Sequence, residues 1–149
     1  MNGDAKRFFL DTNVLIYWLD ASDNAKHVAA RRWVAAIWES GRGGISWQVL
    51  NEFYSNATRK LGFTGPGVRV LVEGYSRWSP VTFELPLLRR AWYWTDHASV
   101  AYWDALIVAA AETAACKYLL SEDFQAGRKF GDLTVVNPFL ASPEDFDFE

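Results

Sequence analysis

The sequence predicts an α/β fold with a mainly parallel sheet, and three observations support this class. Short apolar segments such as Phe8–Leu10 are typical of buried strands, and they alternate with longer segments of helical periodicity. Such alternation favours a parallel sheet, because each return to the sheet passes through a helix. The composition is globular, with 50% hydrophobic and 22% charged residues. No repeat or linker divides the chain, so we expect one domain over residues 1–149.

The first expected elements are a strand, a short helix and a long helix. Phe8–Leu10 predicts the strand, and a short helix follows it through Trp18. Asn24–Ser40 predicts the long helix, because its apolar residues recur at helical spacing and Asn24 can cap it. The glycines of "GRGG" are expected to end this helix.

The middle of the chain predicts a strand, two helices and a loop. "ISW" is expected to be a short strand, and Ser46 can cap a helix from Trp47 to about Lys60. "GFTGPG" is expected to be a loop, and Val68–Trp78 to be helical. The apolar residues on one face of the first helix are Val49, Phe53, Ala57 and Leu61.

The second half continues the alternation. "SPVTFEL" is a third strand candidate, and Pro86 suits the start of a helix over Leu87–Asp96. Ser99 is expected to cap a long Ala-rich helix that ends near Ala115. "KYLLS" and "LTVVNP" predict two further strands. Residues 141–149 form an acidic tail that we expect to be loosely ordered.

The composition also indicates the compartment. A single cysteine, Cys116, excludes an internal disulfide and favours a reducing environment. Two histidines, His27 and His97, are too few for a zinc site of His and Cys ligands. The N-terminal apolar stretch is broken by Asp11, unlike a signal peptide, and the longest apolar run, Ala105–Ala111, is too short to span a bilayer. We therefore expect a cytoplasmic protein without a membrane partner.

The net charge of −3 argues against a nucleic-acid partner only if the acids are spread evenly. Acids gathered around a metal ion would remove that objection, because the charge of the ion enters the local balance. Eight Trp and ten Phe residues are more than a small core needs, so some are expected on an interaction surface.

Asp11 interrupts an apolar stretch and allows two interpretations. It can cap the following helix, or it can be a functional carboxylate at the carboxyl end of the first strand, where α/β sheets place their ligands. Thr12 or Asn13 can cap the helix instead, which would leave Asp11 free.

Three further acids fall in comparable places. Asp104 lies in a helix that is apolar almost all round, so we expect it to be buried and either paired or metal-bound. Glu52 lies beside an apolar helix stripe and can equally be an ordinary surface residue. Asp123 follows a strand and can equally serve a turn. Glu122 is expected to be solvated, and Glu112 to be paired or at the surface.

In a parallel sheet these four acids can converge on one rim. Carboxylates about 5 Å apart repel by roughly 3 kcal/mol per pair at an effective dielectric near 20, so a cluster needs protons or cations. Oxygen ligands favour Mg²⁺ or Mn²⁺, which can activate a water and bind a phosphodiester.

Four segments in this order resemble the PIN domain family and, within it, the bacterial VapC-type toxins. They are "FFLDTNVLIYWLD", "ISWQVLNEFY", "SVAYWDALIVAAAE" and "YLLSEDFQAG", and "LTVVNPF" extends the resemblance to Phe139. The resemblance implies a three-layer α/β/α sandwich and Mg²⁺- or Mn²⁺-dependent cleavage of single-stranded RNA. It also implies a homodimer and a cognate, VapB-like antitoxin that inserts a peptide at the site.

The resemblance assigns roles to individual residues. It implies that Asp11, Asp104 and Asp123 bind metal directly or through water, and that Glu52 holds or activates a water. Asn13 and Ser121 match polar positions that support these acids. This sequence departs from the family pattern at Ala101, where a small hydroxyl residue is common, and at Glu122, which adds a charge beside Asp123.

Other residues are candidate RNA contacts. Trp92, Tyr93 and Trp94 can stack on unpaired bases, although such a cluster more often belongs to a core or protein interface. Basic residues that can contact phosphate, or simply form a solvated surface, are Arg59, Lys60, Arg89, Arg90, Arg128 and Lys129.

Two alternatives compete with a ribonuclease toxin. One is a binding module that keeps the PIN fold without activity, which the presence of all four acids disfavours. The other is a haloacid-dehalogenase-like phosphatase, which also has an Asp after its first strand. That chemistry requires a second acid two residues later, where this sequence has Asn13.

Overall fold

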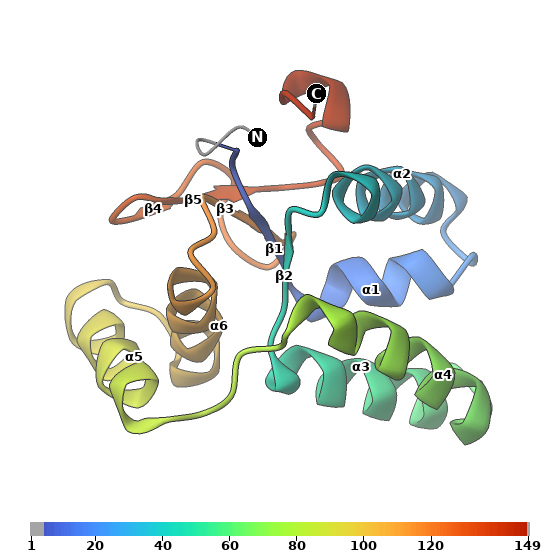
Figure 1. Ribbon diagram of the computed structural model, residues 1–149, viewed down its shortest axis with the longest axis horizontal. Helices are drawn as coiled ribbons and strands as arrows, with labels where there is room; N and C mark the ends of the chain where they lie inside the picture. The colour runs from blue at the N-terminus through green and yellow to red at the C-terminus, as the bar shows by residue number, and fades with distance from the viewer. Residues whose placement is uncertain (1–4, 149) are drawn as a thin grey trace.

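A computed structural model describes residues 5–148 of the protein, which are built around a five-stranded sheet in the order β2-β1-β3-β5-β4 (Figure 1). Strands β1 (Phe8–Leu10), β2 (Gly43–Gly44), β3 (Tyr118–Leu120) and β5 (Leu133–Val136) are parallel, and β4 (Lys129–Phe130) pairs antiparallel with β5. The predicted α/β class with a mainly parallel sheet is therefore confirmed.

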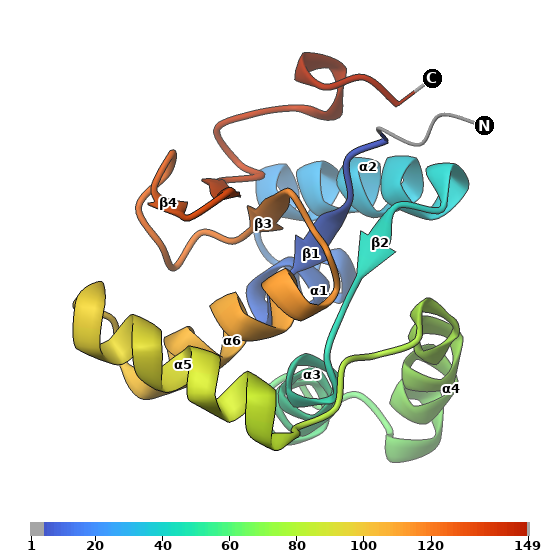
Figure 2. The ribbon, with the colours of Figure 1, turned by 60° about the vertical axis from the view of Figure 1, so that its left-hand side comes forward.

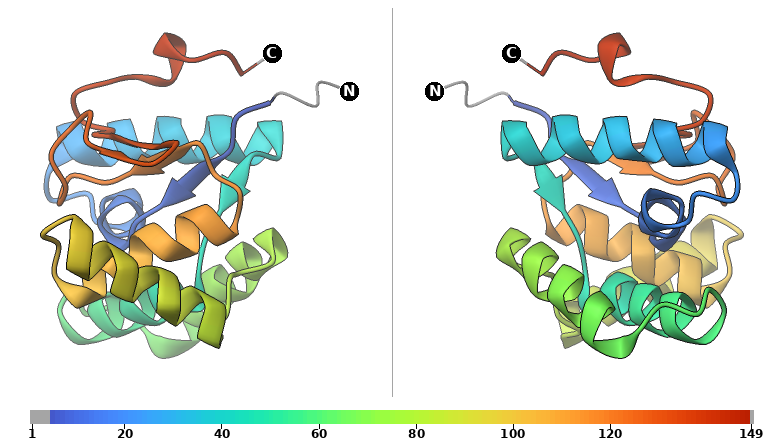
Figure 3. Two further views of the ribbon diagram at one scale, coloured as in Figure 1. Left: turned by 90° about the vertical axis from the view of Figure 1, so that its left-hand side faces the viewer. Right: turned by 90° about the vertical axis from the view of Figure 1, so that its right-hand side faces the viewer.

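Helices cover both faces of this sheet. Helices α1 and α2 lie on one face, whereas α6 lies on the other with α5 packed outside it (Figures 2 and 3). Helices α3 and α4 pair with each other beyond the carboxyl ends of β1 and β2 (Figure 1). No helix within residues 5–148 is both long and apolar enough to cross a bilayer. The helices are α1 (Thr12–Leu19), α2 (Asn24–Ser40), α3 (Trp47–Arg59), α4 (Gly65–Tyr75), α5 (Leu85–His97) and α6 (Tyr102–Thr113), with short 3₁₀ helices η1 (Ser76–Trp78) and η2 (Pro143–Asp145).

The core lies between the sheet and these helices. All three residues of β1 are buried, as expected for a central parallel strand flanked by helices on both faces. In α6 the buried stretch is Ala105–Ala111, whose small residues allow close packing. Trp33 of α2 is fully buried, and its indole N–H is shared between the carbonyl groups of Pro138 (3.0 Å) and Ala141 (3.2 Å). The core thereby connects β1 to the C-terminal segment.

The strand predicted at "ISW" lies two residues earlier, at Gly43–Gly44. Only glycine fits there, because a Cβ atom on Gly43 would lie 2.5 Å from the Trp78 indole and one on Gly44 would lie 2.5 Å from the Cys116 Sγ. Ser46 instead forms an isolated bridge with Val81, so the strand predicted at "SPVTFEL" is wrong beyond this contact. Strand β4 was not expected, since two residues carry no readable periodicity.

The helix starts correct several predictions. Ser46 caps α3 as expected, since its hydroxyl accepts the Val49 N–H at 3.2 Å. Asp23, rather than Asn24, caps α2 by accepting the Lys26 N–H at 3.1 Å. Helix α4 begins at Gly65, inside the predicted loop, because the Thr64 hydroxyl caps it and Pro66 fits its first turn.

Helix α6 begins later than predicted. Ser99 does not cap it; Ser99 has a left-handed backbone with φ of 52°, and the helix starts at Tyr102. The N-cap residue is Ala101, which provides no side-chain hydrogen bond. The first turn of α6 is consequently open at its N-terminus, next to Asp104.

The C-terminal segment makes defined contacts where we expected loose order. Its helix η2 carries a capping box between Ser142 and Asp145, and Glu144 pairs with Arg32 of α2. Phe146 and Phe148 pack on Phe8, with ring centroids 5.5 and 5.1 Å from that ring. The apolar residues at positions 146 and 148 therefore hold the tail against the sheet. Glu149 lies outside the described residues.

Candidate functional site

Strand β1 marks the point where the chain reverses its direction across the sheet. Strand β2 lies on one side of β1, and β3 lies on the other. Along the chain, α1 and α2 connect β1 to β2, and α3–α6 connect β2 to β3. In open parallel sheets, the crevice at the carboxyl ends of such strands is the usual ligand site. Asp11 follows β1 directly, and Ser121 follows β3 directly. Both residues therefore stand at this crevice.

A cleft of about 360 Å³ lies at this edge of the sheet. All four predicted acids line it, although they come from four separate parts of the chain. Asp11 lies between β1 and α1, Glu52 lies in α3, Asp104 in the first turn of α6, and Asp123 after β3. The other residues that line the cleft are Thr12, Asn13, Ile16, Tyr17, Gln48, Asn56, Trp103, Ile107 and Glu122.

Asp11 is the most buried of the four acids and also caps α1. One of its carboxylate oxygens accepts the Thr12 N–H at 2.7 Å, and the other accepts the Ser121 hydroxyl at 2.7 Å. The pKa of Asp11 is raised to about 6, mainly because burial disfavours the ionised carboxylate. The two hydrogen bonds lower the pKa and offset part of this rise, whereas the charges of Asp123 and Glu52 increase it. The two interpretations of Asp11, cap and site residue, thus meet on one side chain, and Thr12 and Asn13 do not replace it as cap.

Asn13 joins the acids of two segments. Its amide nitrogen lies 3.3 Å from an Asp11 carboxylate oxygen, 3.1 Å from the Ser121 hydroxyl and 3.2 Å from an Asp123 carboxylate oxygen. Its carbonyl oxygen faces the Glu122 N–H at 3.3 Å, and the Ser121 hydroxyl accepts the Asp123 N–H at 3.1 Å. Asp11 and Asp123 therefore converge on a single donor, with Asn13 and Ser121 placed to orient them.

Glu52 is half-buried and is held by two donors. The Thr12 hydroxyl donates to one of its oxygens at 2.7 Å, and the Gln48 amide donates to the other at 3.1 Å. The sequence analysis missed Gln48, whose signal was its position one helical turn before Glu52 on the same face of α3. The Gln48 carbonyl oxygen is buried and has no hydrogen-bond partner among residues 5–148.

Asp104 is less buried than the sequence indicated. The residue is half-buried and neighbours Trp103, whose exposed fraction is 66%, because the fully buried part of α6 begins only at Ala105. Partial burial raises the pKa of Asp104, and the charges of Asp123 and Glu52 raise it further. The four acids therefore act on one another electrostatically through the cleft.

The neighbouring acids are paired rather than free. Glu122 was expected to be solvated, but it forms an ion pair with Lys26 of α2 at 2.7 Å, because α2 passes beside the loop after β3. Glu112 is paired, as expected; it contacts Arg90 at 3.0 Å and accepts the Trp94 indole N–H at 2.6 Å. Neither of these ion pairs involves Asp11, Glu52, Asp104 or Asp123.

The candidate RNA contacts lie elsewhere. Trp92 and Tyr93 are exposed on α5 but do not line the cleft, and Trp94 is buried. The aromatic residues that do line it are Tyr17 and Trp103, which the sequence analysis did not single out. None of the basic residues proposed as phosphate contacts lines the cleft within the described structure; these are Arg59, Lys60, Arg89, Arg90, Arg128 and Lys129.

The donor set fits a hard divalent cation that keeps part of its water shell. Carboxylates and an unpaired amide carbonyl, that of Gln48, are oxygen donors of the kind that Mg²⁺ and Mn²⁺ prefer. Across residues 5–148, no three His, Cys, Asp or Glu side chains are grouped closely enough to hold a metal ion by themselves. Mg²⁺ commonly binds through one or two carboxylates and several waters, which is the coordination this cleft can offer.

Comparison with known proteins identifies the family of the chain. No curated protein matches the chain. The sequence pattern of the PIN domain matches residues 8–129, a range that contains all four acids, Asn13 and Ser121. PIN domains are typically nucleases and generally use divalent metal ions. The chain therefore belongs to the PIN domain family.

Proposed function

We propose that the protein is a Mg²⁺- or Mn²⁺-dependent endoribonuclease that cleaves single-stranded RNA and acts as the toxin of a type II toxin–antitoxin pair. The observation that carries the nuclease proposal is the convergence of Asp11, Glu52, Asp104 and Asp123 on one cleft at the carboxyl edge of the sheet. Binding of a polyanion to this acidic cleft requires a cation, which the same acids can hold.

In this proposal the acids divide the work. Asp11, Asp104 and Asp123 would hold the cation directly or through its bound waters, and Glu52 would hold or activate the attacking water. A bound divalent cation would supply an acidified water and neutralise charge on the phosphodiester. Thr12 and Gln48 each donate to a different oxygen of Glu52, so they fix the direction in which this carboxylate faces. No side chain of the cleft needs to form a covalent intermediate.

Replacing Asn13 by Ala is expected to lower RNA cleavage about 10- to 100-fold, the usual effect of removing a group that orients metal ligands. The amide lies within 3.3 Å of both Asp11 and Asp123, so its loss frees two acids at once. The measurement is kcat/KM at several Mg²⁺ concentrations, and the required Mg²⁺ concentration should rise. Asn51→Ala, on the exposed side of α3, is the matched control. An unchanged Mg²⁺ requirement in Asn13→Ala would contradict the role of the amide.

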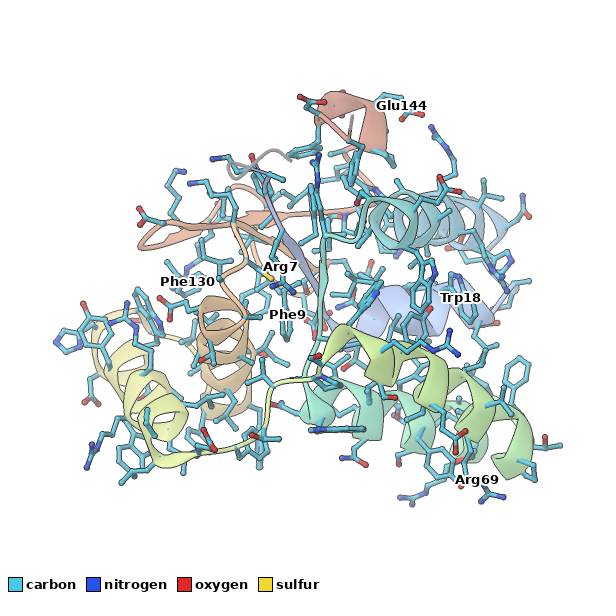
Figure 4. The ribbon with its side chains drawn as sticks, viewed as in Figure 1. Arg7, Phe9, Trp18, Arg69, Phe130 and Glu144 are labelled. Carbon is cyan, nitrogen blue, oxygen red and sulfur yellow. The ribbon has the colours of Figure 1, made fainter. Side chains whose placement is uncertain are left out.

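We also propose a cognate antitoxin, VapB-like, as protein partner. A largely apolar cleft of about 590 Å³ lies between α1, α2 and α4, lined by Trp18, Trp38 and Tyr75 among others. Figure 4 labels Trp18 on α1. The Tyr75 hydroxyl is buried there and has no hydrogen-bond partner within the described residues. An antitoxin segment bound in this cleft would cover its apolar walls.

The self-association that we propose, a homodimer, is supported by a different surface. Exposed aromatic side chains also lie on α5, outside the acidic cleft, where Trp92 and Tyr93 are 47% and 42% exposed. Large aromatic residues are enriched in interface cores, so a second copy of the chain is the partner that we assign to this face.

The decisive test is metal-dependent cleavage of RNA by the purified protein. We expect single-stranded RNA to be cut with Mg²⁺ or Mn²⁺, the reaction to stop with EDTA and to resume when excess Mg²⁺ is added. The same protein should leave phosphate monoesters intact, whereas release of phosphate would favour the phosphatase alternative. RNA binding without cleavage at any metal concentration would favour a binding module. The toxin role is tested by growth arrest on expression and its relief by the product of the adjacent gene.

A further inference from the structure

Trp103 is a large exposed aromatic residue in the wall of the acidic cleft. Its exposed fraction is 66%, higher than that of any other aromatic residue among the large hydrophobic side chains exposed in residues 5–148. It immediately precedes Asp104 in the first turn of α6, and both residues line the cleft. A phosphodiester held at the acids would therefore lie in the same cleft as this indole.

The backbone of Trp103 is tied to the catalytic side of the cleft. Its carbonyl oxygen accepts the Gln48 amide at 3.4 Å, and the same amide donates to Glu52 at 3.1 Å. Its ring lies next to that of Tyr102, with centroids 5.5 Å apart and planes inclined by 58°. The indole is thus positioned by α6 and by its neighbour while most of its surface stays open.

The aromatic residue of the opposite wall is already engaged. Tyr17 of α1 packs edge-on against Phe139 at 5.2 Å, and the Lys26 ammonium group lies 4.9 Å from its ring centroid. Lys26 in turn pairs with Glu122. The two walls therefore differ: Tyr17 is covered by a ring and a cation, whereas Trp103 presents a free aromatic surface beside the acids.

We propose that Trp103 is a base-stacking platform that holds one unpaired nucleobase next to the scissile phosphodiester; this inference rests on the proposed ribonuclease function. Stacking on an aromatic side chain requires a base that is not stacked within a duplex, so Trp103 favours single-stranded substrate. Stacking also tolerates any base, so Trp103 contributes affinity and register along the strand rather than sequence specificity. Its effect is on positioning of the substrate and not on the metal or the water.

The test pairs the protein side chain with the base that it contacts. The wild-type protein is first incubated with a random single-stranded RNA library and Mg²⁺, and the cut ends are sequenced to define one oligonucleotide substrate. An abasic nucleotide is then placed at each position on either side of the cleaved bond, and kcat/KM is measured for wild type and Trp103→Ala. Phe83→Ala is the matched control, since Phe83 is 52% exposed but lies outside the cleft and outside the proposed protein interfaces.

We expect Trp103→Ala to lower kcat/KM on the intact oligonucleotide about 5- to 100-fold, within the usual range for one stacked base. At one position, an abasic nucleotide should lower kcat/KM of the wild type by a similar factor. The same abasic nucleotide should lower kcat/KM of Trp103→Ala hardly any further. Trp103→Phe should retain most of the activity, and Phe83→Ala should match wild type.

Several outcomes would overturn the proposal. Wild-type activity in Trp103→Ala would show that no base stacks there. A second outcome is that Trp103→Ala lowers kcat/KM by the same factor on every abasic oligonucleotide as on the intact one. This result would assign Trp103 to folding or to a contact between protein copies, and sedimentation at the assay concentration would identify the latter. If the wild-type protein cuts nothing in the library, the ribonuclease function itself fails, and base stacking fails with it.

Discussion

Asp11→Asn is expected to abolish RNA cleavage while making the metal-free protein more stable. The activity should fall by at least about 100-fold, since even groups that only orient metal ligands typically account for 10- to 100-fold. The stability gain follows from burial. A folded-state pKa of about 6 against the ordinary 3.8 means that ionised Asp11 costs about 3 kcal/mol in the folded protein.

The sign of the pH dependence follows from the raised pKa. Between about pH 4 and pH 6 the folded state keeps a proton on Asp11 that the unfolded state has released, so the free energy of unfolding falls as the pH rises through this window. Above pH 6 the whole cost is present. Asparagine cannot ionise, but its amide also faces the donors Ser121 and Asn13, which removes part of the gain. We therefore expect a net stabilisation of about 1–2 kcal/mol at pH 7.5 and none near pH 4.

Urea denaturation in EDTA at both pH values measures this effect. Asp132→Asn, an exposed acid between β4 and β5, is the matched control and should change neither activity nor stability. Addition of Mg²⁺ should stabilise the wild type and leave Asp11→Asn unaffected. Asparagine caps a helix about as well as aspartate. A variant that loses stability at pH 7.5 in EDTA would therefore show that the hydrogen bonds to the ionised carboxylate outweigh the cost of its burial. Full RNA cleavage by Asp11→Asn would remove Asp11 from the proposed site.

Deleting residues 142–149 is expected to destabilise the protein by about 3 kcal/mol, equivalent to a fall in Tm of roughly 6–12 °C. The deletion removes Phe146 and Phe148, which pack on Phe8 of β1, and exposes the rings that they cover. Phe146 also lies 4.9 Å from the Tyr118 ring and 5.6 Å from the Trp33 ring. Thermal unfolding followed by circular dichroism measures the loss.

A second pair of variants separates the aromatic contacts from the charges. Phe146→Ala combined with Phe148→Ala should reproduce most of the loss in the full-length chain. Glu144→Ala breaks only the exposed ion pair with Arg32 and should cost less than about 0.5 kcal/mol. Equal Tm values for the truncated and intact proteins would mean that the tail is held too weakly to contribute to the fold.

The fold class was readable from the sequence because buried strands and amphipathic helices leave strong periodic signals. Phe8–Leu10 and Asn24–Ser40 were placed at their observed bounds on that basis. Gly43–Gly44 was not, because two glycines carry no apolar pattern and their strand is defined by pairing with β1, which is distant in the sequence. The Trp78 indole and the Cys116 thiol, which leave no room for a Cβ atom there, also come from distant parts of the chain. The tail was misjudged for a similar reason: its acids dominate the composition, whereas Phe146 and Phe148 provide the contacts.

In the cleft, too, features with a local sequence signal were predicted, whereas those that depend on packing between distant segments were not. The four acids that line the cleft were singled out from the sequence because carboxylates in apolar surroundings or after strands require an explanation, and because the order of their motifs matched a family. The partners Thr12 and Gln48 were not found, because both are ordinary polar residues whose hydrogen bonds to Glu52 depend on how α1 and α3 pack. Trp103 was treated as part of a buried helix, and only the observed start of α6 shows that it stands outside the core.

The strands at both edges of the sheet are very short. Strand β2 at one margin is two glycines long, and β4 at the other is also two residues long, with the exposed Lys129 in it. Short edge strands and lysine residues disfavour pairing of sheets from different molecules. Two copies of this chain are therefore poorly suited to joining into one continuous sheet. The homodimer that we propose would instead use side chains on helices, so substitution of exposed aromatic residues would change its strength without altering the sheet.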